Sequence, residues 1–273
     1  MPPLNLPLRL AMFPLILLVL MVLVLQGCSS DNAPVVPVEP IPDANPVGYY
    51  IDDGTATVSD GGSSTISIGD FQAIVYGNRI MMMSVEKELL YDGTITSIDG
   101  NDYTAEFTIY KDGINVTTAT VTGQITTGAS VTGTLSGSGF GDGEFSLLYG
   151  TNNDEVASLD RIENTTNDTW GAMIGGNATI DEYEFEIDAV GSVVDDANTT
   201  LGVFHACQII GASTPIVDAN FYEFTFDLRT CADGDVTADN YSGLATIRSD
   251  AGPDNTLVLM MNNGTYSFSG DFK

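Results

Sequence analysis

Apolar and polar residues alternate strictly along several segments of this chain. In Tyr103–Ile109 every second residue is apolar, and Glu182–Asp188 places acidic residues between Tyr183, Phe185 and Ile187. A period of two puts one face of a strand on a core and the other in water, which is typical of antiparallel sheets. The chain contains no comparable helical periodicity outside its N-terminal apolar run, so an all-β fold is expected.

Short turn signals separate these runs. They are Asx-Gly pairs such as Asp53-Gly54, Asp112-Gly113 and Asn263-Gly264, which favour hairpins between neighbouring strands. Hairpins without long crossovers indicate an up-and-down order. The prediction is two tandem antiparallel β-domains of seven to eight strands each, as small barrels or sandwiches.

An internal repeat supports two domains. Val121-Thr-Gly123 and then Gly143–Leu147 in the first half match Tyr241-Ser-Gly243 and then Gly264–Phe268 in the second. A period of about one hundred residues indicates a duplicated domain rather than a solenoid unit. The expected organisation is a signal segment, a linker, β-domain 1, a joint and β-domain 2, at residues 1–27, 28–46, 47–150, 151–168 and 169–273.

The N-terminus has the layout of a secretory signal. Arg9 precedes an apolar run from Leu10 to Leu25, and Leu25-Gln26-Gly27-Cys28 follows. This ending resembles the bacterial lipobox, and the resemblance implies cleavage before Cys28 and acylation of that residue. The bilayer would then be a partner of the protein through acylated Cys28. The alternative is an uncleaved signal anchor.

Residues 29–46 contain five prolines, which oppose both helix and central strand. We expect this segment to be an extended spacer between the lipid and the first domain.

Charge excludes one class of partner. The chain has 37 acidic residues and 8 Lys or Arg, for a net charge of −29. Eight scattered cations cannot form the basic patch that nucleic-acid binding requires. The same balance opposes electrostatic docking on an anionic membrane.

Two cysteines remain after Cys28. Cys207 and Cys231 lie on consecutive predicted strands, and an oxidising compartment favours a disulfide between them. A metal pair or a reactive thiol is the alternative. Because Cys231 follows the polar phase of its strand, the bond is expected on the outer face or at a frayed strand end.

Catalytic signals are weak. His205 is the single histidine, and it shares a strand face with Cys207, so a structural role is expected. The sequence contains no nucleophile elbow and no zinc-type spacing. Catalytic residues are therefore not assigned, although paired carboxylates leave a hydrolase open as an alternative.

Calcium is the one cofactor for which the sequence offers ligands. Carboxylates recur at Asp233, Asp235 and Asp239, and a second turn holds Asp99 and Asp102. Neither has the spacing of an EF-hand loop. The alternative is Asx-rich turns that bond their own backbone.

Two methionine-rich strands break the alternation. They contain Met81, Met82 and Met83 in one half and Met260 and Met261 in the other. A strand that is apolar on both faces is covered on both sides. We expect a contact between the two domains or a covered edge, with an adaptable partner surface as the alternative.

Several short motifs carry a family resemblance. They are the Gly-aromatic openings Gly48-Tyr49-Tyr50 and Trp170-Gly171, the run Tyr241–Ile247, and the paired cysteines. Together they resemble proteobacterial outer-membrane lipoproteins with tandem all-β domains, a group without an established activity. Ser29, rather than Asp, follows Cys28, which by the same resemblance implies the outer membrane.

The expected function is a non-enzymatic binding or structural role in the cell envelope, with an envelope protein or small ligand as partner. A carboxylate-based hydrolase, calcium-dependent or not, is the first alternative. A passive acidic surface coat is the second.

Overall fold

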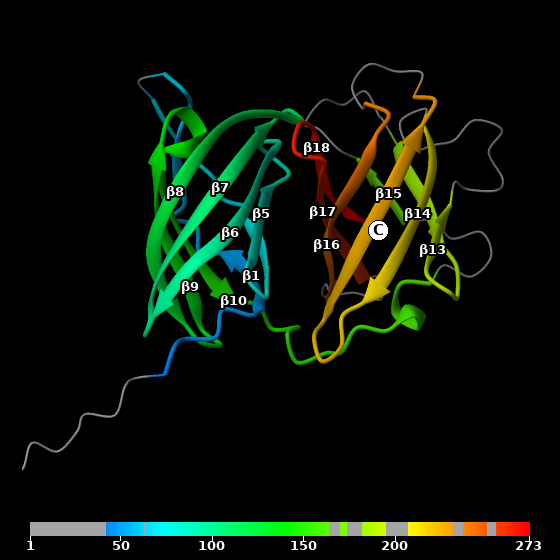
Figure 1. Cartoon of the computed structure of the whole chain (residues 1–273), viewed down its shortest axis with the longest axis horizontal. Coiled ribbons are helices and arrows are strands. Elements are labelled where there is room, and N and C mark those ends of the chain that lie inside the picture. Colours follow the sequence, from blue (N-terminus) through cyan, green and yellow to red (C-terminus); the bar gives the residue numbers. More distant parts are fainter. Residues whose placement is uncertain are drawn as a thin grey trace, which may run out of the picture. The chain divides into compact units, whose positions relative to one another are not determined.

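The computed structural model describes residues 42–62, 64–163, 170–173, 182–194, 207–231, 237–249 and 255–273. These residues form two antiparallel sheets, one from each half of the chain, and the prediction of two tandem all-β domains is confirmed (Figure 1). Within these ranges no helix has the length and apolar character needed to cross a membrane.

The first sheet closes into a barrel of eight strands. The sheet order is β1-β4-β5-β6-β7-β8-β9-β10, and β1 also pairs with β10. A short hairpin, β2–β3, extends the sheet beyond β10. The strands are β1 (Gly48–Asp52), β2 (Thr57–Ser59), β3 (Thr65–Ser67), β4 (Gln72–Tyr76), β5 (Arg79–Ser84), β6 (Leu89–Asp99), β7 (Asp102–Lys111), β8 (Ile114–Thr126), β9 (Ser130–Gly137) and β10 (Gly143–Tyr149).

The second sheet has eight strands in sequential order. Its first and last strands meet through two backbone hydrogen bonds between Gly171 and Lys273, of 3.0 and 2.8 Å, so this sheet also closes. The strands are β11 (Trp170–Met173), β12 (Glu182–Ile187), β13 (Ser192–Val194), β14 (Gln208–Pro215), β15 (Phe221–Arg229), β16 (Asn240–Ser249), β17 (Asn255–Asn262) and β18 (Ser267–Phe272).

Each barrel encloses its own apolar core. Tyr50, Tyr91 and Phe107 are among the side chains that fill the first barrel, and Phe185, Phe224 and Phe226 are among those that fill the second. These are the inward members of the alternating pattern, whose removal from water drives the closure of each sheet.

The repeated glycines lie at equivalent places. Gly123 is in β8 and Gly243 in β16, each the sixth strand around its barrel. A Cβ atom on Gly123 would meet the carbonyl oxygen of Thr132 at 1.9 Å, and one on Gly243 would meet that of Met260 at 1.8 Å. Both barrels thus require glycine where strands six and seven approach closely.

The last residues of the proline-rich segment pack against the first barrel. Ala44 is 9% exposed and lies in the barrel core, and its N–H donates to the carbonyl of Gly100 at 2.7 Å. The carbonyl of Pro46 accepts from the Tyr50 hydroxyl at 2.8 Å. The chain therefore enters the barrel at the end that carries the β6–β7 turn.

Candidate site at the seam between the barrels

A third apolar cluster joins the two barrels. It unites side chains that point outward from both barrels, and we call it the seam. Its buried members are Tyr49, Ile74, Met81, Met83, Leu90 and Tyr110 from the first barrel and Ile216, Ala219, Phe221, Leu244, Val258 and Met260 from the second.

Strand register explains which methionines reach the seam. Met81 lies opposite Ile74 and Asp92 on the outer face of its sheet, whereas its neighbour Met82 points into the first barrel. Met83 and Met260 lie in the seam, and Met261 lies in the core of the second barrel. All five are fully buried. β5 and β17 are apolar on both faces because one face fills a barrel and the other meets the second barrel.

One end of the seam carries a polar network around Gln72. Its amide oxygen accepts from the Tyr49 hydroxyl and from Nη1 of Arg248, both at 2.6 Å, and its Nε2 donates to Asp271 at 3.0 Å. Arg248 also forms an ion pair with Asp271 at 3.0 Å. Gln72 is 7% exposed, and its partners come from both barrels, so the network satisfies a buried amide across the seam.

A second network surrounds Asp92. Arg79 binds both of its carboxylate oxygens, at 2.9 and 3.1 Å, and Nδ2 of Asn262 donates to it at 2.9 Å. The Tyr110 hydroxyl donates to Asn262 at 3.2 Å. Burial, with the nearby Asp92 carboxylate, raises the pKa of Tyr110 to about 12.

Each barrel thus supplies an Arg–Asp pair, and the other barrel supplies the amide that completes it. These cross-barrel bonds favour one docking geometry, because another arrangement would lose the hydrogen bonds that Gln72 and Asn262 make to the ion pair of the other barrel.

Backbone bonds add to the seam at the β7–β8 turn. The N–H of Asn115 donates to the carbonyl of Thr265 at 3.0 Å, and that of Ser267 donates to Gly113 at 2.9 Å. Ile114 and Tyr266 form an isolated antiparallel bridge. The tip of this hairpin therefore continues as a short two-stranded contact with the chain just before β18.

The joint between the barrels is pinned to both. The Asn153 amide accepts from the Tyr49 N–H at 2.6 Å and donates to the Tyr49 carbonyl at 2.8 Å. On the other side Asn220 donates to the Asn152 carbonyl at 3.0 Å and accepts from Arg161 at 2.6 Å. Short asparagine-centred bonds therefore hold the joint to each barrel.

A groove of about 360 Å³ opens beside the seam. The turn between β4 and β5 forms one wall, and the outer face of the β15–β16 pair lies opposite. The lining consists of Tyr76, Gly77, Asn78 and Arg79 from the first barrel and Glu223, Phe224, Thr225, Ser242, Gly243 and Leu244 from the second.

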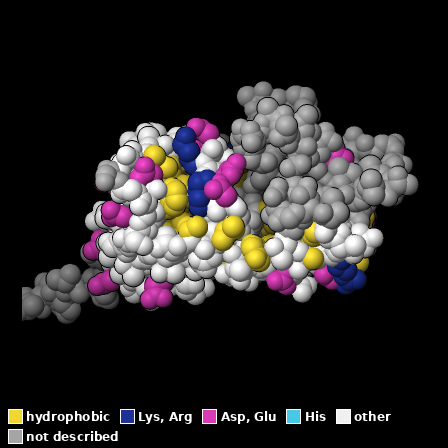
Figure 2. Space-filling view, turned by 90° about the horizontal axis from the view of Figure 1, so that it is seen from above, with side chains coloured by type: hydrophobic (Ala, Val, Ile, Leu, Met, Phe, Trp, Pro, Cys, Tyr) yellow, Lys and Arg dark blue, Asp and Glu magenta, His cyan; other side chains and the backbone are white. Residues whose placement is uncertain are grey.

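The scarce cations lie beside acidic groups. Lys87 pairs with Glu86 at 2.6 Å, and Lys111 contacts both Glu88 and Asp112. Figure 2 shows a face on which dark-blue side chains lie against magenta ones. Among the described residues of that face, the basic side chains therefore lie next to acidic ones.

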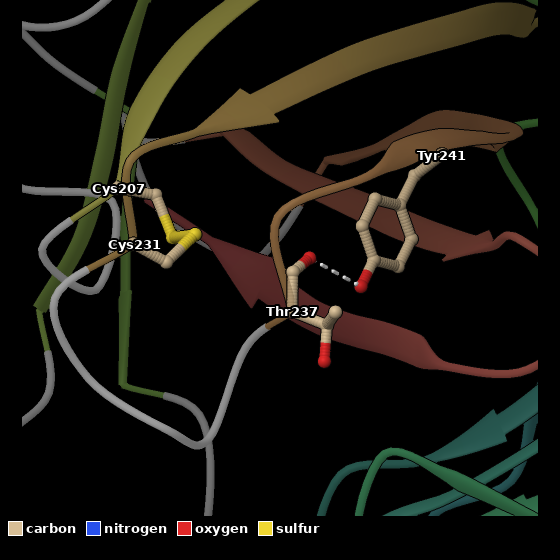
Figure 3. Close-up of a disulfide and its surroundings, with 4 residues drawn as sticks. All are labelled: Cys207, Cys231, Thr237 and Tyr241. Carbon is tan, nitrogen blue, oxygen red and sulfur yellow. Dashed lines mark hydrogen bonds between the residues drawn. A yellow bond between two sulfur atoms is a disulfide. The ribbon is translucent and has the colours of Figure 1, made fainter.

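The predicted disulfide between Cys207 and Cys231 is confirmed, with an S–S distance of 2.05 Å. Figure 3 shows the two side chains meeting where their strands end, close to the segment in which the Tyr241 hydroxyl donates to the Thr237 carbonyl at 3.0 Å. Both cysteines lie at strand ends, the second of the two expected positions, and not on the outer face, since Cys207 is 1% exposed and belongs to the barrel core. Thr230 has a left-handed φ of 53°, which breaks the alternation just before Cys231.

The carboxylates of the calcium hypothesis are only partly described. Asp233 and Asp235 lie outside the described residues, while Asp239 is exposed and accepts from the Asn240 N–H and from Asn263. Asp99 and Asp102 are exposed at the β6–β7 turn, where Gln124 donates to Asp102 at 3.2 Å. In the part of the chain that the structure describes, no three His, Cys, Asp or Glu side chains gather as a metal site.

Cys28 and His205 also lie outside the described residues. Lipidation therefore stays a prediction, as does the structural role of the histidine.

Sequence reasoning missed the polar residues of the seam. Five polar or charged residues interrupt otherwise apolar or alternating strands: Gln72, Arg79, Asp92, Arg248 and Asn262. The available signal was the rarity of cations in this chain, which makes a strand arginine unusual.

Comparison of the chain with protein-family models, with curated proteins and with solved structures finds no match.

Proposed function

We propose that the protein is a lipid-anchored bacterial lipoprotein of the outer membrane with a non-enzymatic binding or structural role in the cell envelope. The two barrels work in this role as one body, held at a distance from the bilayer by the segment that follows Cys28.

The seam carries the binding part of the proposal. A buried apolar cluster flanked by two cross-barrel networks fixes the barrels to each other, and a groove opens beside it with walls from both. Small-molecule sites are concave and often lie at domain interfaces, with a few polar groups that orient the ligand. A duplicated barrel thereby gains a surface that neither copy has alone.

The lipobox-like ending at Cys28 and the prolines after it support the anchored location. Several acyl chains on one residue bind a bilayer stably, because each buried methylene adds about 0.8 kcal/mol. The negative charge of the chain opposes other contact with an anionic bilayer, so the lipid itself supplies the attachment.

Mass analysis of the full chain expressed in a Gram-negative host tests the anchor. The expected N-terminal residue is an acylated Cys28, and the protein should sediment with the outer membrane. The matched variant Cys28→Ser should retain residues 1–27 without acylation. An unacylated Cys28, or sedimentation with the inner membrane alone, would contradict the proposal.

A further inference from the structure

The floor of the seam groove carries exposed polar side chains among apolar residues, and both of its strands are paired on each side. Thr225 and Ser242 are cross-strand partners with exposed side chains, and Glu223 lies two residues along β15 on the same face. β15 pairs with β14 and β16, and β16 pairs with β15 and β17. An extended peptide therefore finds no free strand edge here.

The wall adds an aromatic ring and further hydrogen-bonding groups. The Tyr76 ring is half-buried and packs edge-on against Phe221, with centroids 6.3 Å apart. Asn78 is exposed at the turn. Arg79 engages Asp92 through Nε and Nη2, so its Nη1 group stands outside that pair.

Taken together, these groups mix donors with acceptors and carry no net positive charge. Arg79 is balanced by Asp92, and Glu223 adds a negative charge in a chain of net charge −29, which disfavours anionic ligands. Each hydroxyl of a sugar both donates and accepts hydrogen bonds, and the C–H face of a sugar ring packs on aromatic rings. A neutral sugar therefore matches this lining. A volume of about 360 Å³ is near the small end for ligand pockets, so the ligand is short.

We infer that the seam groove binds a short uncharged saccharide, gripped between the Tyr76–Arg79 turn of the first barrel and the β15–β16 face of the second. This inference rests on the proposed binding role and names its ligand class.

The test is calorimetric titration of the full chain in detergent with three neutral probes: cellotetraose, maltotetraose and tetra-N-acetylchitotetraose. At least one should bind saturably. Thr225→Arg, which fills the groove from an exposed position, should weaken that binding about tenfold or more. The matched variant Thr134→Arg, on an exposed outer position of the first barrel, should leave it unchanged.

Tetragalacturonate and tetraalanine provide the opposing outcomes. Binding of either in place of the neutral probes overturns the saccharide assignment, as does neutral-probe binding that Thr225→Arg does not weaken, or no binding of any neutral probe. The acylation state of Cys28, measured by mass on the same preparation, keeps the two proposals apart. Acylated protein that ignores saccharides refutes only the inference, whereas unacylated protein that binds them refutes only the anchor.

Discussion

The variant Met81→Ala tests the stability of the seam independently of the barrel interiors. Met81 belongs to β5 of the first barrel, is fully buried, and lies in the seam cluster with side chains of the second barrel. Met81→Ala removes a buried methionine side chain, which costs about 2–5 kcal/mol through lost transfer energy and the cavity left behind. Because the seam stabilises both barrels, this loss should extend to the second barrel. At about 2 kcal/mol per M, the urea midpoint falls by about 1–2.5 M.

Trp170 is the reporter for this experiment, since it is the single tryptophan and lies in β11 of the second barrel. It is 9% exposed, and its Nε1 donates to the Ile162 carbonyl at 2.8 Å. Its fluorescence should show the lowered midpoint although the change lies in the other barrel. Thr120→Ala, on the exposed face of β8, should shift it little. An unchanged Trp170 midpoint alongside a destabilised first barrel would refute the argument.

Three further results are expected. Gly243→Ala should lower the free energy of unfolding by about 3 kcal/mol or more, because the added Cβ would meet backbone at 1.8 Å. Chemical denaturation measures this change, and a smaller loss of stability than that of Ser242→Ala would contradict it. Reducing Cys207–Cys231 should lower stability by about 3 kcal/mol, from the loop of 24 positions that it closes, and an unchanged melting temperature would argue against this. Burial raises the pKa of Tyr110 to about 12. The free energy of unfolding that Tyr110 contributes is therefore fully present below pH 10 and is lost between pH 10 and 12. Unfolding curves that stay constant over that range would count against this expectation.

The alternating pattern was enough to predict the sheets, because it records which side of each strand meets a core. The matched motifs around Gly123 and Gly243 lie on the sixth strand of each barrel, so the repeat also gave the strand alignment between the halves. Closure into barrels could not be read from the sequence, since it depends on pairings such as Gly171 with Lys273, far apart along the chain.

Local backbone geometry explains why Cys231 lies at a strand end rather than on the outer face. Alternation along β15 placed it outside, but the left-handed residue Thr230 reverses the phase one position earlier. No residue type at that position signals such a turn, since threonine rarely adopts a positive φ.

The seam depends on tertiary contacts that pattern cannot supply. The sequence shows that β5 and β17 are apolar on both faces, which predicted a covering partner for each. It does not show that Gln72 completes an ion pair of the second barrel, or that Asn262 completes one of the first. These residues are far apart along the chain and meet only when the barrels dock.

Scanning calorimetry of the full chain measures whether the two barrels unfold as one body. The seam predicts a single transition whose calorimetric and van't Hoff enthalpies agree. Two resolved transitions, or a van't Hoff enthalpy near half the calorimetric value, would show that the barrels unfold independently and would contradict the account.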